Sequence, residues 1–389
     1  MSRILALNGG SSSIRFAVFE RASVRAVLRG KIERVGTGGA RIKTDDRTAE
    51  IPIPAHAAPG DFLLEWLESC AACGGIEAAG HRIVHGMSHM KPERVTPPLL
   101  EELKGLVPFD REHLPRELEL IEAVARRRPE LPQVLCFDTA FHRDMPGVAS
   151  LLPIPRRYAA AGIRRYGFHG LSYTYLLEEL RRIGDAAATR GRVILAHLGS
   201  GASLAAVLDG RCIDTSMGFT PTAGLVMGTR SGDLDPGLMG YLAASERMSP
   251  ERFETLVNHE SGLLGISETS SDVRDLLARE ASDARAAEAL AIFCYQARKW
   301  IGAFAAALGG CDTLVFAGGI GENSAPIRER ICAGLAFLGM HLDESSNAAH
   351  ASCISRPGSS VTVRVIRTDE ESVIAALTNG LLNPATAGA

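Results

Sequence analysis

The chain has 389 residues, which favours two domains, and its 46% hydrophobic and 22% charged residues are ordinary for a globular protein with a core. Its net charge of -3 argues against a surface for nucleic acid or for a membrane. The eight cysteines are mostly isolated, so we expect a reduced, cytoplasmic protein in which the single CxxC, Cys70 to Cys73, serves packing rather than redox chemistry or zinc binding.

The N-terminal residues predict a β-hairpin. The apolar run at residues 4–7 is interrupted by the stretch NGGSS at residues 8–12, and residues 13–19 then alternate between apolar and polar. A turn with so many backbone N–H groups and hydroxyls can cradle a phosphate or hold the water shell of a magnesium ion, although Asn-Gly turns also occur in ordinary hairpins. We find no apolar run here that is long enough for a signal peptide.

Strands and helices alternate through the next part of the chain. Asp138 directly follows a buried strand, and an acid just past the C-terminal end of a strand is a typical ligand position in α/β folds. His81, His85 and His89 lie close together, but no cysteine or carboxylate completes a set of metal ligands, so we do not expect a metal there. We expect strands at residues 25–31, 50–53, 79–84 and 133–137, and helices at residues 61–73, from residue 97 behind a Thr96 cap, and at residues 115–128.

The second half repeats the beginning of the first. We expect a strand at residues 151–155, then the loop YGFHG and a helix capped by Ser172. Residues 193–208 form another strand, Gly/Ser turn and strand, and at a shift of about 190 residues Gly9 matches Gly199 and Ser13 matches Ser203. Two such hairpins predict a duplicated domain with a ligand cleft between the copies.

Residues 214–236 read as a functional loop, because they contain few large apolar residues and several Gly and Pro. Arg230 lies among small neighbours, so its guanidinium is able to reach an anionic ligand. The alternative is that Arg230 holds the carboxylate of Asp233 or Asp235 within the loop.

The C-terminal part begins with helices at residues 236–308, one of them capped by the stretch SDVR at residues 271–274. The apolar segment at residues 286–309 carries Glu288 and Arg298, so it predicts a buried helix rather than a membrane span. A strand at 313–317, a glycine turn at 318–323 and a helix from about residue 325 predict an anion or nucleotide site, although the spacing is not GxGxxG. A last strand at 361–366 and a closing helix from residue 368 precede a loose tail, NPATAGA.

Taken together, these pieces resemble the acetokinase family, the acetate and propionate kinases, over almost the whole chain. The stretches that carry the resemblance, in family order, are NGGSSSIRF, GHRIVHG, FDTAFH, RYGFHG, HLGSGAS, DTSMGFTP, GLVMGTRSGDLDP, SSDVRD, FAGGIGENS and RTDEE. The resemblance implies the duplicated α/β fold of actin, sugar kinases and Hsp70 (ASKHA, ribonuclease H-like) with an active-site cleft between the domains. The boundaries we expect are residues 1–145 with 371–389 for the first domain and 146–370 for the nucleotide-binding domain.

The activity that the resemblance implies is reversible, ATP-dependent phosphorylation of a short carboxylate, acetate first, to an acyl phosphate and ADP. It also implies Mg²⁺ or Mn²⁺, a cytoplasmic homodimer, and the following site residues. Asp138, Arg82, Arg230 and His169 match catalytic positions; Arg82, Val84, Phe168 and Pro221 match the acceptor site; Asn8 and Glu370 match metal positions; Arg15, His197, Leu198, Gly199, Ser200, Gly201, Asp272, Val273, Arg274, Gly318, Gly319, Ile320, Gly321 and Glu322 match the nucleotide site.

Three positions depart from the family pattern. Arg15 stands where the family commonly has Lys, and Ser200 stands where Asn is usual, so one contact to phosphate is lost. Glu112 stands in PFDREHLP where the family reads PLAPLHNP and has an apolar pocket residue. A carboxylate there would repel a carboxylate substrate, so either Glu112 turns to solvent or acetate is not the preferred acid.

Alternative functions differ in the acceptor or in the role of the nucleotide. Propionate or another small acid is distinguished from acetate by pocket volume alone, which a sequence does not resolve. A sugar-kinase-like hydroxyl kinase needs an Asp base, for which only Asp138 is available. A nucleotide-switched binding protein and a pyrophosphate-dependent kinase are the remaining alternatives, and the SSDVRD and GGIGEN segments favour adenosine over pyrophosphate.

Overall fold

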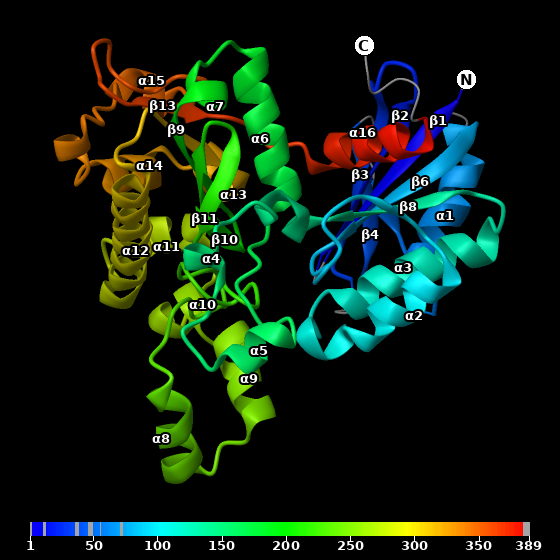
Figure 1. Ribbon diagram of the computed structural model, residues 1–389, viewed down its shortest axis with the longest axis horizontal. Helices are drawn as coiled ribbons and strands as arrows, with labels where there is room; N and C mark the ends of the chain where they lie inside the picture. The colour runs from blue at the N-terminus through cyan, green and yellow to red at the C-terminus, as the bar shows by residue number, and fades with distance from the viewer. Residues whose placement is uncertain are drawn as a thin grey trace. The chain divides into compact units, whose positions relative to one another are not determined.

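The structure, a computed structural model, describes residues 2–10, 13–35, 39–45, 50–54, 56–70 and 73–383 (Figure 1). It divides into two compact units: unit 1 is Met1–Phe141, Gly170–Tyr175 and Asp369–Ala389, and unit 2 is His142–His169 and Leu176–Thr368. Ser11 and Ser12 of the predicted phosphate-type turn, and residues 384–389 of the predicted tail, lie outside the described residues. Each unit is an α/β structure built on one mixed sheet.

The sheet of unit 1 is built around a parallel centre. Its strands are β1 (Arg3–Gly9), β2 (Ser13–Glu20), β3 (Ala26–Glu33), β4 (Arg41–Thr44), β5 (Ile51–Pro52), β6 (Ile76–Ile83), β7 (Glu93–Arg94) and β8 (Gln133–Phe137). Their order is β5-β4-β3-β2-β1-β6-β8-β7. β1 pairs in parallel with β6, and β6 pairs in parallel with β8, so the C-terminal ends of these three strands meet at one edge.

Helices cover both faces of this sheet, since every residue of its central strand β1 from Ile4 to Gly9 is buried. Leu5 and Leu7 of β1 pack with helices α1 (Pro59–Ser69) and α3 (Leu114–Arg127). Ile4 and Ala6 point to the opposite face and pack against the C-terminal helix α16 (Glu370–Leu382). Figure 1 shows α16 on one side of the sheet of unit 1, and α1 and α3 on the other.

The sheet of unit 2 repeats the centre of the first sheet. Its strands are β9 (Arg192–Leu198), β10 (Ala202–Leu208), β11 (Arg211–Thr215), β12 (Thr313–Ala317) and β13 (Thr362–Val365), in the order β11-β10-β9-β12-β13. β9 is antiparallel to β10 and parallel to β12, as β1 is to β2 and β6. The shared order β3-β2-β1-β6-β8 and β11-β10-β9-β12-β13 confirms the duplication, and with it the fold class.

The two hairpin loops differ in length. The last paired residues enclose four residues, 10–13, in the first copy and three residues, 199–201, in the second. A constant shift of about 190 residues therefore aligns the first strand of each hairpin but cannot align both strands.

The remaining elements are helical. They are α2 (Pro97–Gly105), η2 (Val107–Phe109), η3 (Asp138–His142), α4 (Gly147–Ser150), α5 (Arg156–Ala160), α6 (Gly170–Arg182), α7 (Ala187–Arg190), α8 (Gly237–Glu246), α9 (Pro250–His259), α10 (Gly262–Ser267), α11 (Val273–Arg279), α12 (Ala284–Leu308), α13 (Gly318–Asn323), α14 (Ala325–Cys332), η4 (Ala336–Leu338) and α15 (Glu344–Ala348). The predicted buried helix is α12, which packs on β9 and β10. Among the described residues, no helix has the length and apolar character needed to cross a membrane.

Three local predictions were wrong. Residues 151–155 form no strand: Pro153 and Pro155 lack the N–H that a sheet ladder needs, and Leu151 and Ile154 are exposed. Ser172 does not cap its helix, because α6 begins at Gly170 and His169 occupies the N-cap position with a left-handed φ of 56°. Residues 318–323, predicted as a turn, form the short helix α13.

We predict that Gly80→Ala destabilises unit 1. A Cβ at Gly80 would lie 2.6 Å from Ile374 Cγ2 and would overlap the hydroxyl of Thr378, so α16 would have to move away from β6. Overpacking of this kind costs about 1–3 kcal/mol, to be measured as a lower free energy of unfolding in urea. Gly380→Ala, on α16 itself, is the control. A Cβ at Gly380 would meet nothing within 4 Å, and alanine is the better helix former, so this variant should raise the free energy of unfolding by up to about 1 kcal/mol. Equal stability of the two variants would contradict this packing.

Candidate functional site

Three polar side chains lie together where the parallel strands of unit 1 end. Asn8 is near the end of β1, Arg82 near the end of β6, and Asp138 directly after β8. Alternation along a strand puts residues two apart on the same face, so all three continue the face that carries α16. The residues two positions before them, all packed against α16, are Ala6, Gly80 and Cys136.

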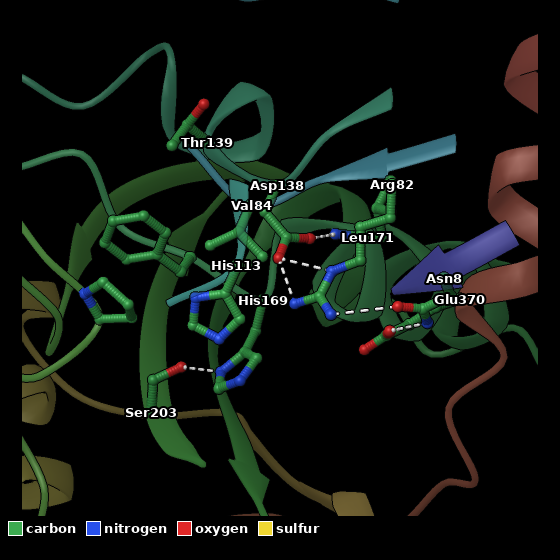
Figure 2. Close-up of polar contacts among 12 residues, drawn as sticks. Asn8, Arg82, Val84, His113, Asp138, Thr139, His169, Leu171, Ser203 and Glu370 are labelled. Atoms are coloured by element: carbon green, nitrogen blue, oxygen red, sulfur yellow. Dashed lines mark hydrogen bonds and ion pairs between the residues drawn. The ribbon is translucent and has the colours of Figure 1, made fainter. Parts of the chain in front are cut away.

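Arg82 is held by two of these strand ends (Figure 2). Its Nε and Nη2 donate to Asp138 Oδ2 at 3.0 and 2.6 Å, and its Nη1 donates to Asn8 Oδ1 at 3.1 Å. The backbone N–H of Leu171, in the first turn of α6, donates to Asp138 Oδ1 at 3.2 Å. The Asp138 side chain is fully buried, whereas the Arg82 side chain keeps 13% of its exposure, so part of the guanidinium remains accessible to a ligand.

The start of α16 adds two acids to this cluster. Asn8 Nδ2 donates to Glu370 Oε2 at 2.7 Å and to Glu371 Oε1 at 2.9 Å. Both oxygens belong to residues more than 360 positions away in the chain, a contact that no local pattern could reveal. Asn8 therefore orients the acids at the N-terminus of α16 while its own oxygen accepts from Arg82.

Burial and neighbouring charges shift the pKa values of the groups in this cluster. Burial opposes the charged form of Arg82, but Asp138 and Glu370 outweigh it and raise the pKa of Arg82. Burial raises the pKa of Asp138, an effect that the guanidinium of Arg82 opposes. Burial, followed by the charge of Glu370, also raises the pKa of Glu371. Arg82 is consequently charged at every physiological pH and suits an anionic ligand.

Glu117 is a buried acid beside this cluster that sequence reasoning missed. It lies on α3 with 2% of its surface exposed, and both of its carboxyl oxygens accept from the backbone N–H of Val84, at 3.1 and 3.2 Å. The signal that could have found it is periodicity: Glu117 occupies the apolar face of α3 between Leu114 and Ile121. Glu112, the predicted departure in the acceptor pocket, is half-buried.

In unit 2, His169 lies against the end of the repeated hairpin. His197 of β9 and Ser203 of β10 are opposite each other in the ladder, so their side chains share a face. The ring of His169 stacks on that of His197, with centroids 4.3 Å apart and planes 18° apart. His169 Nδ1 and Ser203 Oγ lie 2.8 Å apart, the contact drawn in Figure 2. The sequence indicated Ser203 only through the repeat, where it matches Ser13, and did not predict its contact with His169.

The loop 199–201 brings several predicted residues of unit 2 together. A Cβ at Gly201 would lie 3.4 Å from His169 Nε2 and 3.6 Å from Arg230 Nη1, so both nitrogens face the backbone of this loop. Gly318, with a φ of +76°, approaches the other side, where a Cβ would lie 2.7 Å from Leu198 O. Ser200 O accepts from the backbone N–H of Gly228 at 3.0 Å. An arginine and a histidine thus lie beside one glycine loop, a combination that suits an anion.

The acids of the loop 214–236 bind backbone groups. Asp233 Oδ1 accepts from the N–H of Gly224 at 2.8 Å, and Asp235 Oδ1 accepts from the N–H of Gly237 at 2.7 Å. Arg230 Nη1 donates to Pro221 O at 3.2 Å. The anion-site interpretation of Arg230 therefore stays a prediction, with one oxygen of each acid held by the backbone.

The predicted adenosine-side residues have unequal environments. Asp272 is the N-cap of α11, where it accepts from the Arg274 N–H at 2.8 Å, and Val273 is buried. Arg274 is exposed and pairs with Asp272. Glu322 Oε1 accepts from the N–H groups of Gly318 and Thr368, at 3.0 and 3.1 Å, and so holds the backbone of this segment. Gly319, Ile320 and Gly321 complete α13.

The other predicted positions are divided between the units. Val84 is in unit 1 and buried, while Phe168, which is 1% exposed, and Pro221 are in unit 2. Arg15 lies opposite Asn8 on β2 of unit 1 and is exposed, whereas all the other predicted nucleotide residues are in unit 2.

The comparisons with known proteins agree on one family. The model of the acetokinase family matches residues 3–376. An acetate kinase from Methylocella silvestris is 42% identical over 402 aligned positions, which cover 98% of this chain and 99% of that protein. The chain belongs to the acetokinase family.

The likeness to other members of the acetokinase family also extends over nearly the whole chain. A propionate kinase from Citrobacter rodentium is 40% identical and covers 96% of this chain, which in turn covers 95% of it. The crystal structure of a propionate kinase from Francisella tularensis superposes with a TM-score of 0.91 at 36% identity, covering 98% of this chain and all of that one. As a member of this family, the protein is an ATP-using kinase with a carboxylate as acceptor.

We predict that Asp138→Asn lowers kcat by about 100-fold or more, because a small misplacement of a catalytic group costs on the order of 10²-fold. The amide keeps the shape of the side chain but removes the charge that fixes the buried Arg82. The measurement is a steady-state assay, with circular dichroism to confirm the fold. Asp61→Asn, which removes the same charge from an exposed pair with Arg126, should keep full activity. If Asp138→Asn retained a tenth of the activity or more, its role in orienting Arg82 would be refuted.

Proposed function

We propose that this protein transfers the γ-phosphoryl group of ATP to acetate and forms acetyl phosphate and ADP, reversibly and by direct in-line transfer. The observation that carries the proposal is Arg82: a partly accessible guanidinium, compensated by Asp138 and Asn8, at the C-terminal ends of the parallel strands of unit 1. The full-length likeness to proteins named acetate kinase supports acetate as the acceptor.

The acceptor needs no general base. Acetate is ionised at neutral pH, so the enzyme has to bind an anion rather than create one. We assign that task to Arg82, with Val84, Phe168 and Pro221 as apolar contacts for the methyl group. Asp138 accepts from Arg82 with one oxygen and from the Leu171 N–H with the other, an arrangement that favours an orienting role over a base. This argues against a hydroxyl acceptor of the sugar-kinase type.

The transferring phosphoryl group needs donors that stabilise its spreading negative charge. His169 Nε2 and Arg230 Nη1 both face the loop 199–201, which supports a role for them at the phosphate. The remaining predicted nucleotide residues are assigned to binding the phosphates and the adenosine of ATP.

We also propose that the protein uses a magnesium ion. Mg²⁺ commonly binds to one or two carboxylates and otherwise to water and phosphate oxygens. Glu370, oriented by Asn8, fits that requirement, and the part of the chain that the structure describes contains no cluster of three His, Cys, Asp or Glu side chains able to cage a metal. When bound, the ion would neutralise charge on the nucleotide phosphates.

Propionate is the second candidate acceptor. Relatives named propionate kinase are as similar to the chain as several named acetate kinase. One methylene changes the binding free energy by only about 1–3 kcal/mol, so a single enzyme often accepts both acids.

We further propose a cytoplasmic homodimer. All eight cysteines are free, which fits a reducing compartment. α8 carries Leu238, Met239, Tyr241 and Leu242, yet has no buried residue, and Tyr241 is 68% exposed. A second copy of the chain would cover this apolar helix.

We predict that hydroxylamine traps an acyl phosphate when the purified protein is given MgATP and acetate. The panel includes formate, propionate, butyrate, hydroxy acids and dicarboxylic acids, with a sugar as the hydroxyl control. Trapping with acetate supports the proposal, and trapping only with another acid keeps the reaction class but changes the substrate. ATP hydrolysis without trapping from any acid would refute a carboxylate kinase.

We predict a sedimentation mass of twice 41.4 kDa, reduced to one chain by Tyr241→Asp on α8. The charge would have to be buried against the partner. Phe337→Asp, a change at another exposed aromatic residue outside α8, is the control and should leave the dimer intact. A wild-type mass of one chain would exclude the dimer.

A further inference from the structure

We propose that Glu117 is a positioning residue for the acceptor: its carboxyl group accepts from the backbone N–H of Val84 and holds this segment beside the strand ends that carry Asn8 and Arg82. The inference rests on the proposed function, in which Arg82 binds the acceptor carboxylate and Val84 contacts its methyl group.

Glu117 occupies a gap at the end of the central ladder. β6 ends at Ile83, so the N–H of Val84 is the first one after the strand, and Glu117 supplies its acceptor with both carboxyl oxygens. On the β1 side, a methyl group placed on Gly9 would lie 3.7 Å from Glu117 Cγ. Glu117 thus lies next to the ends of the two strands that carry Asn8 and Arg82.

A second buried acid explains where the proton resides. Asp110 is 4% exposed, and its Oδ1 accepts from the backbone N–H of His113 at 3.1 Å and lies 2.9 Å from His113 Nδ1. These contacts lower the pKa of Asp110 despite its burial. Burial and the charge of Asp110 raise the pKa of Glu117 well above its usual value, although Arg82 and the Val84 N–H oppose this rise.

The charged groups around Glu117 make its proton matter for binding. Asp110 and Asp138 add negative charge near Glu117, and Arg82 adds positive charge. The charge of His85 helps to lower the pKa of Asp110. If Glu117 ionised, its carboxylate would compete with the acceptor carboxylate for the field of Arg82. Acceptor binding should therefore weaken as rising pH removes the proton, while nucleotide binding, assigned mainly to unit 2, should not.

The raised pKa of Glu117 also makes the stability of the fold depend on pH. The folded state favours protonated Glu117, so between the unfolded and folded pKa values it binds more protons than the unfolded state, and stability falls as pH rises through that window. Glu117→Gln removes the ionisation and should flatten this part of the pH–stability curve.

The experiment measures KM for acetate and for ATP between pH 6 and 9 in four proteins: wild type, Glu117→Leu, Glu117→Gln, and Glu119→Gln as an exposed control on the same helix. Glu117→Leu leaves the buried Val84 N–H without an acceptor and should raise KM for acetate about tenfold or more, with KM for ATP unchanged within about twofold. Glu117→Gln should restore most of this binding and abolish the rise of KM for acetate with pH, whereas Glu119→Gln should match wild type.

The inference would be overturned by an unchanged KM for acetate in Glu117→Leu, or by the same pH profile in wild type and Glu117→Gln. An equal rise of KM for ATP in Glu117→Leu would also overturn it, because the effect would then be general. If Glu117→Leu fails to fold, the profile of Glu117→Gln decides. Absence of acyl phosphate from wild type with every acid is a separate outcome, which refutes the proposed function itself.

Discussion

A guanidinium that is largely removed from water needs compensation of its charge, and in unit 1 the partners of Arg82 come from several elements. Asp138 must follow β8 directly, Asn8 must reach across from β1, and the N-terminus of α16 must bring its acids to Asn8. The Leu171 N–H satisfies the second oxygen of Asp138. An arginine that is oriented by fixed partners can bind a carboxylate without first losing conformational freedom, which is the property that the acceptor site of a kinase needs.

The two units use one topology to build two different groups of residues at their strand ends. In unit 1 the strand ends carry Asn8, Arg82 and Asp138, so the edge of the sheet presents side chains. In unit 2 the equivalent hairpin has a loop one residue shorter, and it presents backbone groups of the loop 199–201 with His169 alongside. We proposed Arg82 for the acceptor carboxylate and the loop 199–201, with its neighbouring histidine and arginine, for the phosphates.

Sequence reasoning found what local patterns encode. Apolar runs predicted the central strands, the Asn8 and Gly199 turns predicted the duplication, and Asp138 was recognised from its place after a strand. It failed where context overrides pattern: the segment 151–155 looks strand-like but contains Pro153 and Pro155, and Ser172 has the chemistry of a cap but lies within the helix. The partners of Asn8 could not be predicted, because an ordering contact over 362 positions exists only in the folded chain.

The packing of α16 on β6 has a consequence for biosynthesis. Residues 3–137 form the sheet of unit 1, but the helix that covers one of its faces is Glu370–Leu382, close to the C-terminal end of the chain. During translation, the apolar face formed by Ile4, Ala6 and Ala78 stays uncovered until Glu370–Leu382 has left the ribosome, long after the strands themselves. The nascent chain therefore exposes a sheet that can aggregate until this helix emerges, and unit 1 cannot finish folding before the intervening residues of unit 2 have been made.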